Sequence, residues 1–258
     1  MCETLAEFDR LAEIYDESIG TGYASEVGAI ERALSRHRCQ IVLDIGVGTG
    51  RVAKPLEECV FEVVGVDVSL PMLVRAKCKG LKNLILADAE WLPFREKAFD
   101  ATIIVDVLNC LDDPLTVFLQ VERVTVDSVI AIKRKYNRNK EEGKDDPKFA
   151  RLRERVAKLR VLSDGVSRSW EREDRIIELY PPSESKIVSD HVIETSAEGM
   201  ISRFEKGAFR FTTDVPPEQL VLIGNELRHE MQGSSFKRRR IREMHVWNVR
   251  ALPESSKS

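Results

Sequence analysis

The sequence predicts an α/β fold: a doubly wound, mostly parallel sheet with a helical and β-stranded cover inserted before the last strand. Three observations lead to this prediction. Short apolar runs alternate with amphipathic helical patterns in the first half of the chain. A glycine-rich turn directly follows the first of these runs. After Tyr136 the alternation stops, and charged segments continue until an apolar run near the carboxyl end.

The strands are predicted from continuous runs rich in Val, Ile and Leu, which are typical of parallel strands buried on both faces. These runs are Ile41–Ile45, Glu62–Val66, Asn83–Ala87, Ala101–Val107 and Ser128–Lys135. Because helical patterns separate the runs, the connections are expected to be right-handed crossovers.

The helices between the strands carry recognisable start signals. Ser69 is a good N-cap, and Pro71 suits the first turn of the helix that follows. The helix that contains Phe118 starts after Asp113-Pro114. Pro55 stands in the second turn of the helix after the glycine-rich turn, so we expect a kink or a displaced start there.

Length and composition exclude several classes of protein. A chain of 258 residues can bury a full core and favours one elaborated domain over two equal ones. The 43% apolar and 32% charged residues are typical of a soluble globular protein. A net charge of −3 argues against general coating of nucleic acid or of an anionic membrane.

The five cysteines are scattered, with no C-x-x-C pair and no histidine at metal-ligand spacing, so no metal site is predicted. An odd, unpatterned count indicates reduced thiols and a cytoplasmic location. Residues 1–10 carry charges where a signal peptide needs an apolar run. The longest apolar stretches are too short to span a bilayer, so membrane insertion is not expected.

The glycine-rich turn is the most informative segment. The first strand runs through Asp44 into Gly46, Gly48 and Gly50, and glycines let a ligand approach the backbone closely. The dinucleotide pattern G-x-G-x-x-G does not match, because Arg51 stands where the third glycine of that pattern would be. Asp44 would repel a pyrophosphate but attract an ammonium or sulfonium group. The turn therefore predicts a cationic ligand and makes an NAD-dependent oxidoreductase the least favoured enzyme.

Three further strands also end in aspartate. Asp67 follows the second strand, where an acid can accept both hydroxyls of a ribose. Asp88 follows the third, where it can accept from an adenine amino group, and Asp106 follows the fourth. One such aspartate is usually a turn residue or a helix cap. Four in register predict a functional cluster at the carboxyl edge of the sheet.

These segments resemble class I S-adenosylmethionine (SAM)-dependent methyltransferases, in particular the UbiE-like, type 11 group. The resemblance is carried by Val42–Gly50, Val63–Ser69, Leu86–Glu90 with Leu92–Phe94, Phe99–Asp100 with Val105–Asn109, and Phe8–Ala12 with Tyr15–Asp16. It covers about the first half of the chain. It implies a Rossmann-like fold, SAM as cofactor, S-adenosylhomocysteine (SAH) as product, and methyl transfer as the activity.

The resemblance also implies cofactor roles for particular residues. Asp44 and the glycine turn would hold the methionine part, Asp67 the ribose, and Asp88 with Ala89 the adenine, while Met72 is expected as an apolar wall. The residues expected to bind the cofactor are Tyr15, Asp44, Gly46, Gly48, Gly50, Asp67, Val68, Met72, Asp88, Ala89, Asp106 and Val107.

The chain divides into five predicted regions. These are N-terminal helices covering the cofactor site (1–40), the SAM-binding core (41–136), a cover on the acceptor side (137–243), the last core strand (244–252) and a tail (253–258). Within the cover, the patterns predict a loop at Asn137–Asp146, a helix at Pro147–Leu162, one or two strands within Ser167–Leu179, and helices at Ser196–Phe204 and Glu218–Met231.

The acceptor side departs from the family. Asn109-Cys110 stands where many relatives have histidines, and Val126-Asp127-Ser128 replaces the usual Pro-Gly-Gly. No catalytic base is therefore assigned. His191 is the histidine to test as a base, and Tyr15 or Tyr23 is expected to cover the cofactor. Further expected acceptor contacts are Trp170, Tyr180, Arg203 and Phe204.

The basic run Lys237–Arg242 has two interpretations. It lacks interleaved aromatic residues, so a solvated turn before the last strand is favoured over an RNA contact. We therefore expect a small-molecule acceptor. The alternatives are an RNA or protein methyltransferase that uses this run, and a SAM-binding regulatory protein without transferase activity. The sequence carries no signal for the oligomeric state.

Overall fold

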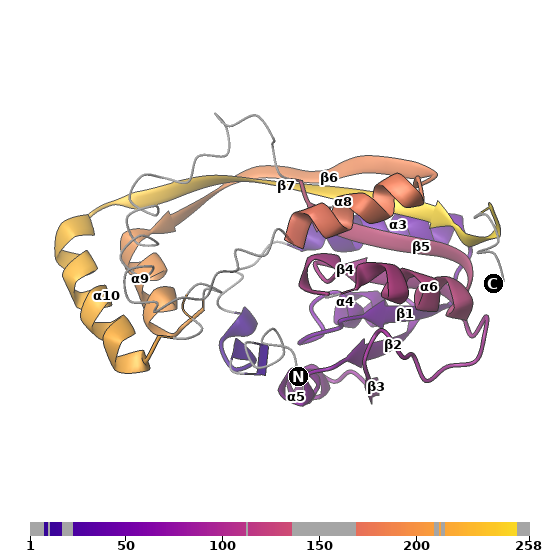
Figure 1. Ribbon diagram of the computed structural model, residues 1–258, viewed down its shortest axis with the longest axis horizontal. Coiled ribbons are helices and arrows are strands. Elements are labelled where there is room, and N and C mark those ends of the chain that lie inside the picture. The colour runs from indigo at the N-terminus through magenta and orange to yellow at the C-terminus, as the bar shows by residue number, and fades with distance from the viewer. Residues whose placement is uncertain are drawn as a thin grey trace.

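The computed structural model describes residues 8–9, 11–16, 23–111, 113–135, 169–208, 212 and 215–251 (Figure 1). The strands are β1 Ile41–Ile45, β2 Glu62–Asp67, β3 Asn83–Leu86, β4 Phe99–Val105, β5 Thr125–Arg134, β6 Glu184–Ser196 and β7 Ser235–Asn248. The helices are α3 Ala24–Arg36, α4 Ala53–Glu58, α5 Leu70–Cys78, α6 Pro114–Val124, α8 Ser169–Leu179, α9 Ala197–Glu205 and α10 Pro217–Met231, with 3-10 turns η1 Leu108–Cys110 and η3 Val249–Ala251.

The sheet has seven strands in the order β3-β2-β1-β4-β5-β7-β6. Strands β1 to β5 pair in parallel, and β7 runs antiparallel to both β5 and β6. The order reverses between β1 and β4, the point at which an open α/β sheet binds its ligands. The predicted doubly wound, mostly parallel fold is confirmed.

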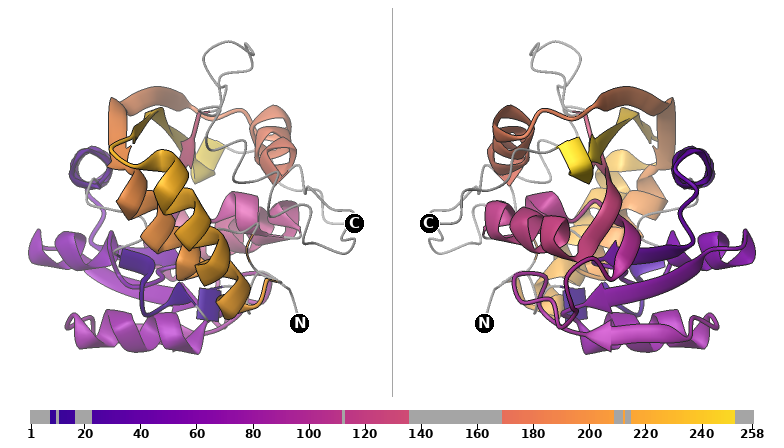
Figure 2. Two further views of the ribbon diagram at one scale, coloured as in Figure 1. Left: turned by 90° about the vertical axis from the view of Figure 1, so that its left-hand side faces the viewer. Right: turned by 90° about the vertical axis from the view of Figure 1, so that its right-hand side faces the viewer.

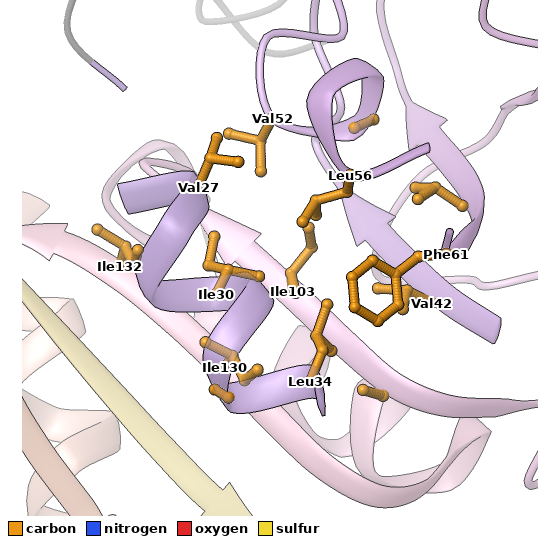
Figure 3. Close-up of a cluster of buried hydrophobic side chains, with 14 of the residues drawn as sticks. Val27, Ile30, Leu34, Val42, Val52, Leu56, Phe61, Ile103, Ile130 and Ile132 are labelled. Atoms are coloured by element: carbon orange, nitrogen blue, oxygen red, sulfur yellow. The ribbon is translucent and has the colours of Figure 1, made fainter. Parts of the chain in front are cut away.

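Apolar side chains pack on both faces of the sheet. On one face, α3 inserts Ile30 and Leu34 against strand residues such as Ile103 and Ile130, all fully or almost fully buried (Figure 3). On the other face, α6 places Phe118 against Trp247 of β7, with ring centroids 5.3 Å apart. Burial on both faces explains why the strands β1, β4 and β5 read as continuous apolar runs.

The helix starts follow the local signals. Ser69 caps α5 by accepting a hydrogen bond from the backbone N–H of Met72, and Asp113 caps α6. Helix α4 begins at Ala53, so Pro55 falls in its first turn, where a missing N–H costs no helical hydrogen bond. The expected displaced start is therefore confirmed.

The prediction of strands within Ser167–Leu179 is wrong, because Ser169–Leu179 forms helix α8. Ile176 of this helix is 1% exposed within the core on the side of α6, and Asp174 pairs with Lys133 of β5 at 2.6 Å. This packing against the sheet determines the helix. The predictions for Asn137–Asp146 and Pro147–Leu162 lie outside the described residues. The helices expected at Ser196–Phe204 and Glu218–Met231 are confirmed as α9 and α10.

The last strand begins earlier than predicted. Strand β7 starts at Ser235 instead of Met244 and ends at Asn248, followed by a 3-10 turn in place of a strand to Leu252. Its partner β6 carries no regular apolar alternation and was missed. The basic run thus lies inside a strand, so its expected position in a turn is wrong. The strand accommodates these charges because Lys237 and Arg239 pair with acids of β6, and Arg242 pairs with Asp106 inside the protein.

The β6–β7 hairpin extends beyond the parallel strands. Arg242 pairs with Arg134 at the carboxyl end of β5, so residues 235–240 of β7 reach past that edge. Helices α9 and α10 connect the far ends of the two strands and lie against each other (Figures 1 and 2). Phe204, Leu220 and Phe236 belong to a separate apolar cluster there. No helix among the described residues is long and apolar enough to cross a membrane.

Candidate functional site

The glycine turn after β1 leaves one stretch of backbone open. Gly46, Gly48 and Gly50 have φ angles of +67°, +53° and +78°, a region that side chains with a Cβ rarely adopt. A Cβ on Gly46 would lie 2.4 Å from Val107, and one on Gly50 would lie 2.2 Å from Leu81. A Cβ on Gly48 would meet nothing closer than 3.9 Å. Gly46 and Gly50 are therefore required for packing, and Gly48 offers free space to a ligand.

Asp44 lies beside this turn on β1 and is 3% exposed. Among the described residues, no group donates a hydrogen bond to its carboxylate. Burial raises the pKa of Asp44 well above its usual value, and the negative charge of Asp67 adds to the shift. A buried carboxylate without a partner is costly, so a cation from outside the protein would complete this position.

Asp67, at the end of β2, is held by backbone. Its Oδ2 accepts from the N–H of Gly48 at 2.8 Å, and its Oδ1 accepts from the N–H of Ser69 at 2.9 Å. Burial raises the pKa of Asp67 despite these donors. Each carboxylate oxygen has two acceptor sites, so the side chain can still accept two hydroxyl groups.

The N-terminal segment is fastened over the same edge. Asp9 accepts from the hydroxyl of Ser69 at 2.6 Å, and Asp16 accepts from the hydroxyl of Thr49 at 2.6 Å. Lys79 also pairs with Asp16. Burial alone would raise the pKa of Asp16, but the hydrogen bonds from Lys79 and Thr49 outweigh it and hold that pKa below its usual value.

Tyr15, carried by this segment, reaches the end of β4. Burial raises the pKa of its phenol, and the charges of Tyr23 and Asp106 increase the shift. Its ring packs edge-on to Phe8 at 6.2 Å. Tyr15 therefore lies near Asp106, close to the glycine turn that contacts Val107, a position from which it can cover a ligand.

Asp106 is engaged by the protein itself. It has a φ of +59° and accepts from both Nη groups of Arg242, at 2.5 and 2.7 Å, and from the hydroxyl of Tyr23 at 2.8 Å. Burial would raise its pKa, but Arg242 outweighs that effect and lowers it. These bonds leave one acceptor site, on Oδ1. The cofactor contact implied by the resemblance stays a prediction that this single site would have to serve.

The side chains of Arg242 and Glu26 complete this network, and sequence reasoning missed both. Each side chain is 0% exposed, and the Nε of Arg242 lies 3.5 Å from Oε1 of Glu26. Glu26 is in α3, and Arg242 is 136 positions beyond Asp106. A local motif carries no signal at that separation.

The predicted adenine and wall residues follow β2 and β3. The N–H of Ala87 donates to the carbonyl of Asp67 at 3.1 Å, which brings Asp88 and Ala89 beside the ribose candidate. Asp88 is exposed and accepts from the N–H of Glu90 at 3.0 Å. Val68 is 47% exposed and Met72 only 2%, so Val68 is the more accessible wall.

The structure corrects two of the expected acceptor contacts. Tyr180 packs on Phe118 in the core, with ring centroids 4.9 Å apart, and Phe204 is 0% exposed in the cluster between α9 and α10. Apolar burial of these rings decides their place. The side chain of Trp170 lies outside the described residues. Burial lowers the pKa of Arg203 on α9.

His191 is exposed on the edge strand β6, directly across from Arg240 of β7. Cross-strand neighbours point to the same face of a sheet, so His191 lies on the face of the Arg240 side chain. Its Nδ1 is 3.2 Å from the hydroxyl of Ser189. A role as a base stays a prediction.

Comparison with known proteins bears on the core. Residues 43–132 match the family model for a methyltransferase domain. The chain is 38% identical over 121 residues to an uncharacterised protein of Methanocaldococcus jannaschii, a match that covers 45% of this chain and 55% of that protein. It is 32% identical over 131 residues to a demethylmenaquinone methyltransferase of Renibacterium salmoninarum, covering 48% and 54%. The chain thus spans about half the length of these relatives.

Solved structures share the fold over most of the chain. The YcgJ protein of Bacillus subtilis aligns with a TM-score of 0.54 and 19% identity, covering 88% of this chain and 99% of that one. The magnesium protoporphyrin IX methyltransferase of Synechocystis aligns with a TM-score of 0.51 and 16% identity, covering 93% and 94%. Together with the glycine turn and the strand order, these findings show that the core of this chain is similar to a methyltransferase domain and that the chain shares its fold with solved methyltransferases.

Proposed function

We propose that this protein is a SAM-dependent methyltransferase that transfers a methyl group to a small-molecule acceptor. The observation that carries the proposal is the presence of two features, Asp44 and Gly48, at the end of the same strand. A buried carboxylate without a hydrogen-bond donor among the described residues lies beside open backbone at the switch point of the sheet. SAM has an ammonium group and a sulfonium centre, which are the charges that Asp44 lacks.

The other carboxylates fit the remaining parts of the cofactor. Asp67 keeps two acceptor sites for the ribose hydroxyls after its backbone bonds to Gly48 and Ser69. Asp88 would accept from the adenine amino group, with Ala89 and the exposed side chain of Val68 beside the ring. Gly48 would let the methionine part approach the backbone.

SAM supplies an activated methyl group, so the chain has to orient the acceptor and exclude water. Tyr15 and Tyr23 lie at the end of β4, beside the position proposed for the methionine part. Burial raises the pKa of both phenols, so they stay protonated at neutral pH and act as hydrogen-bond donors. Asp106, held by Arg242 and Tyr23, would fix the geometry of this side.

A small acceptor is favoured over RNA by the fate of the basic run. Arg239 pairs with Asp190 at 2.8 Å and Lys237 with Glu194 at 3.7 Å, while Arg240 and Arg242 are buried. Charges that are paired on the surface or buried are poorly placed to neutralise the phosphates of a polymer. The demethylmenaquinone methyltransferase matched by the core is named for a small molecule, which supports the same proposal.

Calorimetry with SAM, SAH and NAD tests the cofactor. We expect micromolar binding of SAM and SAH and little binding of NAD. Asp67→Ala should weaken SAH binding by roughly 1–3 kcal/mol, because the ribose hydroxyls lose their partner. Asp190→Ala, which removes an exposed acid on β6, is the matched control. Tight NAD binding with indifference to SAM would overturn the proposal.

Turnover separates an enzyme from a SAM-binding regulator. Release of SAH from SAM should rise when the wild type is given a panel of small acceptors, and should be lost in Asp67→Ala at low SAM. Tight SAH binding without turnover on any acceptor would favour the regulatory alternative. A shift of RNA that weakens steeply with salt would favour the polymer alternative.

A further inference from the structure

Arg240 is a buried cation that pairs with no acidic side chain in the described part of the chain. It lies on β7 and is 5% exposed, and its Nε is closed off from solvent with no hydrogen-bond partner. Among the described residues, no Asp or Glu forms an ion pair with it. Its guanidinium carbon lies 5.2 Å from the centroid of the Tyr23 ring.

The neighbouring Arg242, whose Nε also lacks a hydrogen bond, differs from Arg240 because its charge is paired with acids. It donates to Asp106 through both Nη groups, and Glu26 lies 3.5 Å from its Nε. Both acids of this network, Asp106 and Glu26, form their ion pairs with Arg242. On the opposite face of β7, Arg239 forms a two-bond pair with Asp190. Arg240 is the exception among the three.

The Tyr23 ring does not offset the cost of burying this charge. A cation over an aromatic ring gains about 0.5–2 kcal/mol. Removing an ion from water costs several kcal/mol even after the protein relaxes. The free energy of the folded protein therefore falls if an anion joins Arg240, and Arg is the residue best shaped to hold a carboxylate or phosphate through two hydrogen bonds.

The position of Arg240 links it to the reaction site. Arg240 and Arg51 both contact the ring of Tyr23, at 5.2 and 4.4 Å from its centroid, and Arg51 follows Gly50 directly. The hydroxyl of the same Tyr23 bonds to Asp106 at the end of β4. Arg240 also belongs to the part of β7 that extends past the end of β5. Arg240 therefore shares the Tyr23 ring with Arg51, the residue that follows the glycine turn proposed to receive the methyl donor.

We propose that Arg240 binds an oxoanion, a carboxylate or a phosphate, of the methyl acceptor. The substrate class is then an acidic small molecule whose anionic group lies beside Tyr23 and whose nucleophile faces the donor. This inference rests on the proposed function for the identity of the site, but the anion-binding property of Arg240 can be measured without the cofactor. Binding of the anion leaves the reacting end of the acceptor free, so Arg240 positions the substrate and takes no part in proton transfer.

Simple anions test the inference on the full chain. Calorimetry and thermal melting are run with inorganic phosphate and with acetate, at constant ionic strength against chloride, with and without saturating SAH. The variants are Arg240→Gln and Arg240→Met, and the matched control is Arg239→Gln, an arginine of the same strand that points to the other face. Comparing acetate with phosphate distinguishes an acceptor carboxylate from an acceptor phosphate.

We expect at least one anion to bind the wild type and Arg239→Gln and to raise their melting temperatures. Binding to both Arg240 variants should be weaker by about tenfold or more. Without anion, these variants should melt at or above the wild-type temperature, because they remove an uncompensated buried charge. SAH affinity should be unchanged in all three variants.

Three results would overturn the inference. The first is an anion response that is absent in the wild type or unchanged in the Arg240 variants. The second is a large loss of SAH affinity in those variants, which would assign Arg240 to the carboxylate of the cofactor. The third is a lower melting temperature for both variants without anion, which would assign it a structural role. A wild type that binds no SAH refutes the proposed function instead, and the anion measurements without SAH still decide the role of Arg240.

Discussion

Two glycines of the same turn should separate stability from ligand binding. Replacing Gly50 with alanine places a Cβ at a φ of +78° and 2.2 Å from Leu81, which is 3% exposed. Left-handed backbone costs a residue with a Cβ about 1–2 kcal/mol. Overpacking a buried site costs about 1–3 kcal/mol more. Gly50→Ala should therefore lower the free energy of unfolding by about 2–5 kcal/mol.

Gly48→Ala should lose only the free energy needed to hold a residue with a Cβ in the left-handed backbone region. Its φ is +53°, and the nearest atom to a new Cβ is 3.9 Å away, so the loss of stability should be about 1–2 kcal/mol. The methyl group would instead fill space that the cofactor needs, and SAH should bind about tenfold more weakly or worse. Gly50→Ala, where folded, should keep more of its SAH affinity than Gly48→Ala.

Urea denaturation followed by circular dichroism measures the first quantity, and calorimetry with SAH below the unfolding transition measures the second. Unchanged SAH affinity in Gly48→Ala would refute the proposal that this backbone receives the cofactor. A Gly50→Ala variant as stable as the wild type would refute the packing argument, since Leu81 would then have room to move away.

The other predictions concern buried charge and helix capping. Burial raises the pKa of Asp44, so the free energy of unfolding decreases as pH rises from the ordinary aspartate pKa through this raised value. Asp44→Asn should therefore stabilise the free protein at neutral pH. A bound ammonium lowers that pKa, so SAH binding should release a proton within the pH range between the two pKa values of Asp44 in the bound and free protein. Calorimetry in two buffers over a series of pH values detects this release. Asp44→Asn should abolish it, and an equal release in the variant would contradict this. Arg242→Met should cost about 3–5 kcal/mol in urea denaturation because Asp106 and Glu26 lose their cation, and Glu26→Gln should restore part of it. A cost below about 1 kcal/mol would contradict the network. Ser69→Ala should cost about 0.5–2 kcal/mol, since it removes the N-cap of α5, and an unchanged urea midpoint would contradict that.

The parts of the fold that were predicted correctly depend on local signals. The strands β1, β2 and β4 are apolar runs, and Ser69 and Asp113 are caps that act within their own helices. Packing against distant elements decides the parts that were missed. Helix α8 contains few apolar residues, so its sequence pattern is weak. Its contacts with α6 and β5 show which of these residues are buried. Strand β6 has exposed side chains along most of its length, so its pattern resembles a loop.

The basic run shows why charge alone is a poor guide to exposure. Arg239 and Arg240 are neighbours in sequence, yet one pairs with Asp190 in solvent and the other is buried beside Tyr23. Side chains alternate across a strand, so the faces can be assigned only once the strand is known. The strand, in turn, is defined by its pairing with β5 and β6.

The sequence by itself determined where the candidate cofactor-binding residues lie. Parallel strands joined by right-handed crossovers bring their carboxyl ends to one edge, so the glycine turn and the aspartates that follow the strands had to meet there. Only the tertiary structure decided which charges are already paired. Asp106 and Arg242 lie 136 positions apart, and the register of β7 against β5 brings them together, while Arg240 pairs with no acid among the residues that the structure describes. Local sequence patterns do not predict such a register, because many pairings between strands are possible and long-range packing selects one of them.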